Sequence, residues 1–261
     1  MSLKYDLVHE LLTLSNNISS TTDYYEFDVR GVGKIQSSIS RSSSSSPSKI
    51  FVAFGSDYKS LSLLSRKVYL KNGKKKFKGK VSKVGRIKTK KEIQKIEERI
   101  RDEMLNKPDK VWVSKLVHDI LHKSELFEKL LIEIMDHPIT HEIYVTGYGF
   151  GGALATLFGY QLSFILPNQQ VSVVSFGSPK IGNASWKESF NRKKNLIHYR
   201  FVNRCDPVPS FPLLDYHTGS CIVLGKKKVE LIDYSMDAHN AYEYMSHLYK
   251  INPSIVFFNK T

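Results

Sequence analysis

A glycine-rich turn in the middle of the chain is the first place where residue types and spacing indicate chemistry. The stretch VTGYGFGGALATL passes from an apolar, β-branched segment through four glycines (Gly147, Gly149, Gly151 and Gly152) into a helix-like pattern. Gly147, Gly149 and Gly152 satisfy the phosphate-binding pattern G-x-G-x-x-G. Gly147 and Gly151 also frame a nucleophile elbow, G-x-S-x-G, with Gly149 in place of the serine.

The residues that follow the turn favour the elbow. A dinucleotide-binding turn is followed about 20 residues later by an acidic residue that binds the ribose hydroxyls. No Asp or Glu occurs between Glu142 and Glu188. The turn also lies deep in the chain, whereas a nucleotide-binding fold normally has it in the first βαβ unit. An elbow predicts instead an acid and then a histidine further along the chain.

Five segments of the second half of the chain resemble, in order, motifs of the class 3 (fungal-type) lipases. VTGYGFGGALATL resembles V-T-G-H-S-L-G-G-A-L-A-x-L, with Tyr148, Gly149 and Phe150 in place of His, Ser and Leu. The others are VVSFGSPKIGNASW for F-G-x-P-R-V-G-N-x-x-F, YRFVNRCDPVPSFP for R-x-V-N-x-x-D-x-V-P-x-L-P, DYHTGS for G-Y-x-H-x-G, and HNAY for H-x-x-Y. The resemblance implies an α/β-hydrolase fold, a mostly parallel central sheet covered by helices.

The resemblance also implies roles for the residues at the matching positions. Asp206 takes the place of the triad acid and His239 that of the base, which the aspartate would hold in the tautomer that accepts a proton. His247 and His217 compete for the role of base, but His217 already occupies another histidine position of the family. We therefore favour His239.

Two further segments depart from the family's pattern beside the expected site. The family reads A-F-R-G-[ST] where this chain has AFGSDY, and K-V-H-x-G-F where it has KVWVSKL. The resemblance implies an oxyanion hole made by the backbone N–H of Phe150 and by a second donor after the segment IFVAF. For this second donor we choose Ser56.

Gly149 stands at the nucleophile position, and glycine has no side chain that can attack a carbonyl carbon. No acyl-enzyme forms there, and His239 has no hydroxyl to activate. Glycine is also free of the backbone strain that an elbow imposes on other residues. We expect a lipase-like protein that hydrolyses no esters and binds lipid, polyanion or protein. The alternative is an active triacylglycerol or phospholipid carboxylic ester hydrolase whose serine has been changed to glycine.

The positive charge of the chain is concentrated in one segment. Residues 66–101 contain sixteen Lys and Arg and three acidic residues, and so supply +13 of the net charge of +14. The resemblance places this segment where the family has its lid. It would attract polyanions, and its candidate partners are acyl lipid or an anionic membrane surface, nucleic acid without sequence preference, and a protein assembly partner. The lysines expected to bind are Lys74, Lys75, Lys76, Lys78 and Lys80.

Hydrophobic patterning predicts a single α/β domain over residues 1–261. Amphipathic helices are predicted at the start of the chain and over residues 117–135 and 151–166. Strands are predicted over residues 49–54, 109–113, 142–146, 171–176, 197–202 and 220–232, with a strand and turn in residues 24–35. Residues 37–49, rich in serine, are expected to form a polar loop. Residues 64–107 are expected to form a basic insertion, with a hairpin at Asn72-Gly73 and a charged helix.

The composition argues against several other classes of protein. No apolar run approaches the ~18 residues of a membrane span, and the N-terminal pattern lacks the features of a signal peptide. Cys205 and Cys221 are the two cysteines, and no paired Cys/His spacing indicates a metal site. We expect an intracellular protein, soluble or peripheral to a membrane, that needs no cofactor or metal. A viral source would add the virion as a location.

Overall fold

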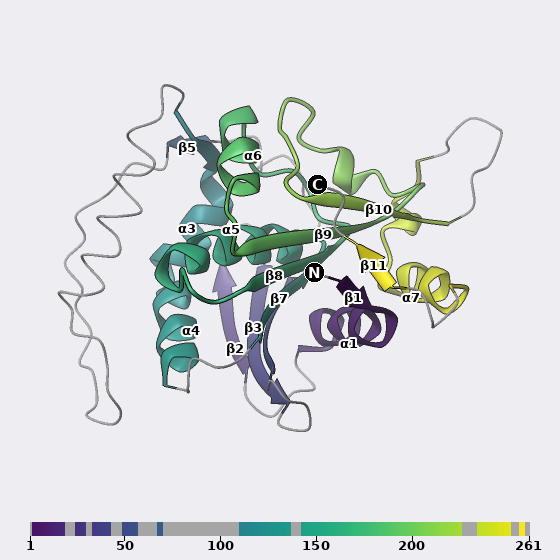
Figure 1. The fold of residues 1–261 in the computed structure, drawn as a ribbon. Helices are drawn as coiled ribbons and strands as arrows, with labels where there is room; N and C mark the ends of the chain where they lie inside the picture. Colours follow the sequence, from purple (N-terminus) through teal and green to yellow (C-terminus); the bar gives the residue numbers. More distant parts are fainter. Residues whose placement is uncertain are drawn as a thin grey trace.

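The protein is built on a seven-stranded sheet with helices on both of its faces (Figure 1). The computed structural model describes residues 2–18, 24–29, 33–42, 49–56, 67–69, 110–136, 142–225, 234–251 and 256–258. The sheet has the order β10-β9-β8-β7-β4-β3-β2. Its strands are β2 (Tyr24–Val29), β3 (Gly33–Ser42), β4 (Lys49–Ser56), β7 (Glu142–Tyr148), β8 (Val171–Phe176), β9 (Leu196–Asn203) and β10 (Ser220–Leu224).

The direction of the strands confirms the predicted mostly parallel sheet. Strands β4, β7, β8, β9 and β10 pair in parallel, and only β2 and β3 are antiparallel to their neighbours. Every residue of β8 is buried, as expected for a parallel strand covered on both faces. The carboxyl ends of β4, β7, β8 and β9 therefore meet at one edge of the sheet, where an α/β fold carries its site.

Alternate residues of each strand point to opposite faces, and each face has its own core. Val145 and Val173 belong to the core of one face, and Tyr144 and Val174 to that of the other. The first core is covered by α3 (Lys115–Lys123), α4 (Leu126–Met135), α5 (Phe150–Ile165) and α6 (Ala184–Asn191). The second is covered by α1 (Tyr5–Asn16) and α7 (Ala241–Tyr249).

The predicted polar loop over residues 37–49 is wrong for residues 37–42, which belong to β3. This strand pairs with β4 along its length, from Ile35 opposite Ser56 to Ser42 opposite Lys49. Ser37 is buried, and its hydroxyl donates a hydrogen bond of 2.9 Å to the Ala53 carbonyl. Main-chain pairing and this hydroxyl place a polar sequence inside the sheet. Residues 43–48 lie outside the described part of the chain.

The predicted single helix over residues 117–135 is also wrong, because α3 and α4 are separated at Ser124 and Glu125. Glu125 has a φ of 59°, in the left-handed region, which a continuous helix excludes. The Ser124 hydroxyl donates to the Ile120 carbonyl and so satisfies an acceptor at the end of α3. Both flanking apolar residues, Leu121 and Leu126, are buried. Packing on both sides of the break maintains it.

The remaining elements are short. Strand β5 (Lys67–Tyr69) pairs antiparallel with β6 (Trp112–Ser114), and β1 (Ser2–Lys4) pairs antiparallel with β11 (Val256–Phe258). The predicted strand over residues 220–232 is confirmed for its first five residues as β10, and residues 226–233 lie outside the described part. The hairpin at Asn72-Gly73 and the charged helix of the basic insertion also lie outside it. None of the described helices has the length and apolar character needed to cross a bilayer.

Candidate active site

The glycine-rich turn joins β7 to α5 in the manner of a nucleophile elbow. Gly149 lies between the two elements with φ 53° and ψ −123°, and its N–H donates to the Phe176 carbonyl at 2.8 Å. The flanking glycines are required by packing. A Cβ on Gly147 would lie 2.2 Å from the Gly151 carbonyl oxygen, and a Cβ on Gly151 would lie 2.2 Å from that of Phe54. The elbow therefore packs directly on the end of β4.

Asp206 and His239, assigned from the resemblance, meet beside this turn. The Nδ1 atom of His239 lies 2.8 Å from Oδ2 of Asp206, whose side chain is fully buried. The other carboxylate oxygen accepts a hydrogen bond of 2.8 Å from the backbone N–H of Val208. A carboxylate at Nδ1 orients the imidazole so that its Nε2 atom faces away from the acid.

The Nε2 atom of His239 faces Gly149. It lies 2.9 Å from the position that a Cβ would take on this glycine, and the neighbouring Cε1 atom lies 3.3 Å from it. The ring of Tyr148 stacks on the imidazole, with 5.0 Å between ring centroids and 25° between planes. The imidazole thus lies in the space beside the elbow that a side chain at position 149 would need.

Tyr244 is a member of this cluster that the sequence interpretation missed. Its hydroxyl donates to Asp206 Oδ2 at 2.5 Å. Burial, and next the negative charge of Asp206, raise the pKa of Tyr244 well above its ordinary value, so the phenol keeps the proton that it donates. The H-x-x-Y resemblance pointed to Tyr242, whose side chain is 80% exposed. Helical spacing is the signal that could have identified Tyr244, because this residue lies on the inward face of α7.

Tyr148 completes the cluster on its other side. Its ring packs edge-on against that of Tyr244, with centroids 5.7 Å apart. Burial, followed by the charge of Asp206, raises the pKa of Tyr148. The position that the family fills with histidine therefore carries a neutral phenol against the imidazole of His239.

The two competing histidines have other surroundings. The Nε2 atom of His217 donates to the Pro209 carbonyl at 2.7 Å. His247 lies on α7 beside Gly225, and a Cβ on that glycine would be 3.3 Å from His247 Nε2. Of the three histidines, His239 is the one that contacts Asp206.

The two oxyanion candidates lie at the same edge of the sheet as the elbow. Phe150 is the first residue of α5, and Ser56 is the last residue of β4, two positions beyond Phe54 on which the elbow packs. The segment after Ser56, residues 57–66, lies outside the described part, as do Lys74, Lys75, Lys76, Lys78 and Lys80. The structure thus brings together the elbow, the acid and the histidine.

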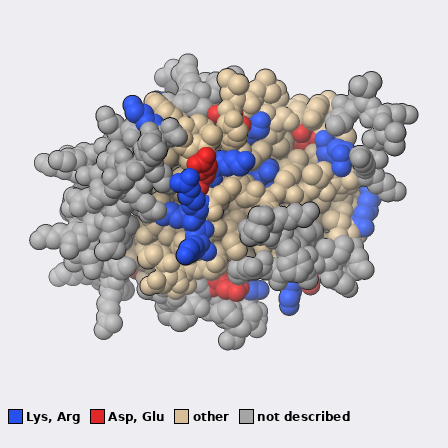
Figure 2. Space-filling view, turned by 45° about the horizontal axis from the view of Figure 1, so that its top comes forward, with Lys and Arg blue, Asp and Glu red and all other residues tan. Residues whose placement is uncertain are grey.

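The loop that follows Asp206 exposes apolar side chains to solvent. In this loop, residues 211–216, Leu213 is 73% and Leu214 is 91% exposed. Lys180 lies beside it, with its backbone N–H donating to the Phe211 carbonyl at 2.7 Å and its ammonium 3.5 Å from the Leu213 carbonyl. In Figure 2, which brings the top of Figure 1 forward, Lys and Arg gather on the described surface with fewer Asp and Glu.

The first described residues after the basic insertion are attached to the same region. Gly182 forms isolated bridges with Val113 of β6 on one side and with Tyr216 of the 211–216 loop on the other. The Asn183 amide accepts from the Trp112 N–H at 3.1 Å and donates to the Lys110 carbonyl at 2.9 Å. Residues 110–113, which follow the +13 segment in the sequence, are thus linked through Gly182 to the loop that carries the exposed leucines.

Comparison with known proteins identifies sequence relatives among lipases. The profile of the family Lipase (class 3) matches residues 80–216, just over half of the 261 residues. Phospholipase A1-II 1 of Oryza sativa subsp. indica is 34% identical over 90 residues, which are 34% of this chain and 23% of that protein. Lipase ZK262.3 of Caenorhabditis elegans is 34% identical over 76 residues, 28% of this chain and 21% of that protein. The aligned part thus spans under a quarter of these relatives.

Solved structures agree on the fold. A triacylglycerol lipase described as having a serine protease triad superposes with a TM-score of 0.57 at 17% identity, over 87% of this chain and 83% of that one. The propeptide complex of Rhizomucor miehei lipase gives a TM-score of 0.55 at 16% identity, over 86% and 70%. Together with the profile match over more than half of the sequence, this fold shows that the chain belongs to the class 3 lipase family.

Proposed function

We propose that this protein is a class 3 lipase-fold protein that binds lipid surfaces without hydrolysing esters. The single observation that carries the proposal is the contact between Gly149 and His239. Gly149 has no side chain that can act as a nucleophile. The imidazole of His239, which would activate a nucleophile, lies 2.9 Å from the position that a Cβ would take on Gly149. Acyl transfer through this elbow lacks its attacking atom.

The Asp206–His239 pair has little catalytic capacity without a serine. Asp206 and His239 can hold and exchange a proton, but acyl transfer at a nucleophile elbow forms its bond to the carbonyl carbon from a serine oxygen, which Gly149 does not supply. Loss of one triad member leaves a residual rate that comes from oxyanion stabilisation and binding alone. The retained hydrogen bonds of Asp206 to His239, Tyr244 and Val208 therefore act here to hold the loops at the sheet edge together.

Lipid is the favoured partner because of the chemistry around the site. The two relatives described above are named as a phospholipase A1 and a lipase, which supports glycerolipids as the ligand class. Leu213 and Leu214 expose apolar surface beside Lys180, and strand β6, which follows the +13 segment in the sequence, is attached nearby through Gly182. Adjacent apolar and cationic groups match an anionic bilayer, where the leucines enter the acyl region and the cations meet the head groups.

A second function has one observation in its favour. The 2.8 Å contact between Asp206 and His239 has the arrangement of an active triad, as expected if serine had been changed to glycine in a triacylglycerol or phospholipid ester hydrolase. Robust esterase activity of Gly149→Ser, compared with Gly149→Ala, would favour this alternative. Because serine needs the space that the imidazole fills, we expect no robust gain.

Vesicle sedimentation tests the lipid-binding proposal. The protein is mixed with vesicles of phosphatidylcholine containing phosphatidylserine, and compared with the double variant Leu213→Gln, Leu214→Gln. We expect the double variant to bind at least about tenfold more weakly, because fully burying one leucine contributes about 1.5–3 kcal/mol and two leucines are changed. The matched control, Val223→Gln with Tyr249→Gln, removes exposed apolar side chains elsewhere and should bind like the parent. Equal binding by all three proteins, or no binding by the parent, contradicts the proposal.

A further inference from the structure

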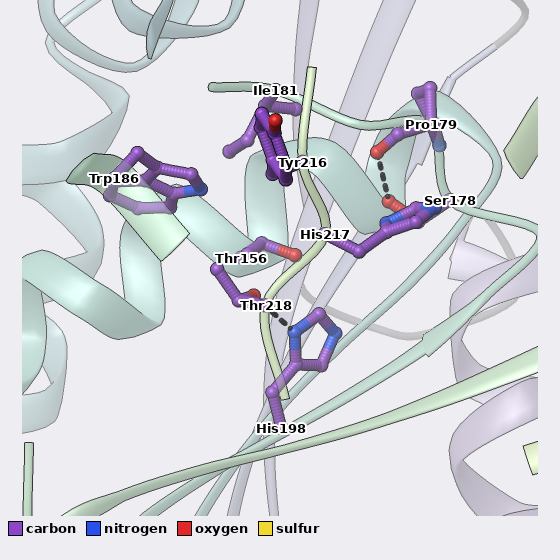
Figure 3. Close-up of a pocket in the computed structure, with 9 residues that line it drawn as sticks. All are labelled: Thr156, Ser178, Pro179, Ile181, Trp186, His198, Tyr216, His217 and Thr218. Atoms are coloured by element: carbon purple, nitrogen blue, oxygen red, sulfur yellow. Dashed lines mark hydrogen bonds between the residues drawn. The ribbon is translucent and has the colours of Figure 1, made fainter. Parts of the chain in front are cut away.

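A small cavity lies behind the elbow, between α5, α6 and the segment that leads into β10 (Figure 3). Its lining is polar for a buried position, and a single water-sized molecule fits inside it. Thr156 comes from α5, Ser178 from the loop after β8, and Trp186 from α6. His217 and Thr218 line it from the segment that leads into β10.

The indole N–H of Trp186 is the group in this cavity whose hydrogen bond is unaccounted for. Trp186 is fully buried and packs edge-on against Tyr160, with centroids 4.6 Å apart. Its Nε1 atom has no hydrogen-bond partner within the described part of the chain. Figure 3 shows the nitrogen-bearing edge of the indole directed toward the space between Ile181, Tyr216 and Thr156. A buried donor of this kind is costly unless it meets an acceptor.

Both histidines that line the cavity are neutral, and the hydrogen bonds that they already make determine which ring nitrogens can still accept one. His198 uses both ring nitrogens, with Nε2 2.8 Å from the Ser175 hydroxyl and Nδ1 2.8 Å from the Thr218 hydroxyl. His217 donates from Nε2 to the Pro209 carbonyl. Burial, and next the charge of Arg200, lower the pKa of His217 to about 3, so its Nδ1 atom keeps a lone pair.

The hydroxyls on the cavity wall supply further acceptors. Thr156 donates its proton to the Gly152 carbonyl at 2.7 Å, and Ser178 donates to the Pro179 carbonyl at 3.1 Å. Each hydroxyl oxygen then keeps lone pairs for another donor. The cavity therefore combines one buried donor with several acceptors, and a molecule that both accepts and donates would satisfy them together.

We propose that this cavity is a binding site for one internal water molecule, which accepts a hydrogen bond from Trp186 Nε1 and donates to acceptors of the facing residues. The water joins α6 to the facing wall of the cavity. Ser178 follows Gly177, at which a Cβ would lie 2.9 Å from Asp206 Oδ2 and 3.0 Å from His239 Cε1. The loop of Ser178 thus lies between this cavity and the acid and histidine.

The sequence departs from the family motif at the residue that supplies the buried donor. The family motif that IGNASW resembles ends in phenylalanine, and this chain has Trp186 there. A phenylalanine has no polar atom and needs no partner at this position. The indole adds the donor that makes the cavity a hydration site, and this inference is independent of the proposed function.

The decisive measurement is a crystal structure of the whole chain at a resolution where ordered water is visible. We expect one density peak about 3 Å from Trp186 Nε1 and within hydrogen-bond distance of at least one second polar atom. A cavity without density, a peak without contact to Nε1, or a protein atom bonded to Nε1 would overturn the proposal. This test needs no variant.

Two substitutions separate the indole's role from general hydration. Trp186→Phe removes the donor and should lose the peak, whereas Trp112→Phe changes the other tryptophan, which is 36% exposed, and should keep it. Retention of the peak at full occupancy in Trp186→Phe contradicts a water held by the indole. If Trp186→Phe fails to fold, the density in the parent protein decides.

Discussion

The Nε2 atom of His239 lies 2.9 Å from the position that a Cβ would take on Gly149. In a working triad this nitrogen faces a serine hydroxyl, which lies one bond beyond the Cβ. Here the imidazole comes closer to the backbone than a serine would allow. The ring is fixed on its other sides by Asp206 and by the stacked Tyr148. The imidazole therefore leaves too little room for a Cβ at position 149.

Side chains at position 149 should destabilise the fold. The φ of 53° is unfavourable for L-residues, and a Cβ would displace His239. We expect Gly149→Ala and Gly149→Ser each to lower the free energy of unfolding by about 1–3 kcal/mol. Urea unfolding of the three proteins measures this. Variants as stable as the parent would show that the imidazole moves away freely and that the site has kept room for serine.

Tyr244 should stabilise the fold through Asp206. Tyr244→Phe removes the donor of a buried 2.5 Å hydrogen bond to a carboxylate, and we expect a loss of about 1.5–3 kcal/mol in the free energy of unfolding. The control is Tyr249→Phe on the same helix, where the side chain is 66% exposed and the change should stay within about 0.5 kcal/mol. Equal effects of the two substitutions would contradict a role for this hydrogen bond.

The buried neutral histidines should make stability fall in mild acid. Burial lowers the pKa of His198 well below 6.5 and that of His217 to about 3, whereas both return to their ordinary value on unfolding. Between these values the unfolded chain binds more protons, so the free energy of unfolding falls as the pH drops below 6.5. Each histidine contributes up to about 1.4 kcal/mol per pH unit.

The His217→Gln variant isolates one of these contributions. Glutamine keeps an N–H that can reach the Pro209 carbonyl but does not titrate. Unfolding measured from pH 7.5 to pH 5 should show a shallower decline for the variant, by about 1.5–2 kcal/mol over this range. Parallel curves for the two proteins would exclude His217 as a source of the acid sensitivity.

The +13 segment should dominate the electrostatic part of lipid binding. Changing Lys74, Lys75, Lys76, Lys78 and Lys80 to glutamine should weaken binding to anionic vesicles and reduce its salt dependence, because each lysine near the surface contributes about 1 kcal/mol at low salt. Titrations of vesicles and of duplex DNA at two salt concentrations check this. Tighter binding to DNA than to vesicles at equal phosphate would favour nucleic acid as the partner. Unchanged binding of the glutamine variant to both vesicles and DNA would show that the segment binds neither polyanion, and would leave a protein as its remaining candidate partner.

The sequence predicted those parts of the protein that depend on local patterns. Apolar runs defined β4, β7 and β8, and the spacing of Gly147 and Gly151 defined the elbow, because each signal lies within a few residues. Ser37 was assigned to a loop because its place in β3 depends on pairing with a strand that only tertiary structure brings alongside. The break at Glu125 depends on packing on both sides of it, which periodicity does not record.

The distinction between local sequence patterns and contacts made by tertiary structure also applies within the site. Motif order pointed to Asp206 and His239, and the structure places these two residues in contact. Tyr244 escaped notice because its role depends on the orientation of α7 relative to Asp206, which lies 38 residues away in the sequence. The closeness of His239 to Gly149 is likewise a three-dimensional fact, and no residue pattern encodes it.

Esterase activity tests the central claim most directly. The purified protein and His239→Ala are assayed side by side with a short-chain p-nitrophenyl ester and with a phosphatidylcholine substrate in vesicles. Because Gly149 offers His239 no side-chain hydroxyl to activate, we predict equal rates for the two proteins on both substrates. Turnover by the parent that is lost in His239→Ala would show that another nucleophile serves this histidine, and would contradict a non-hydrolytic function.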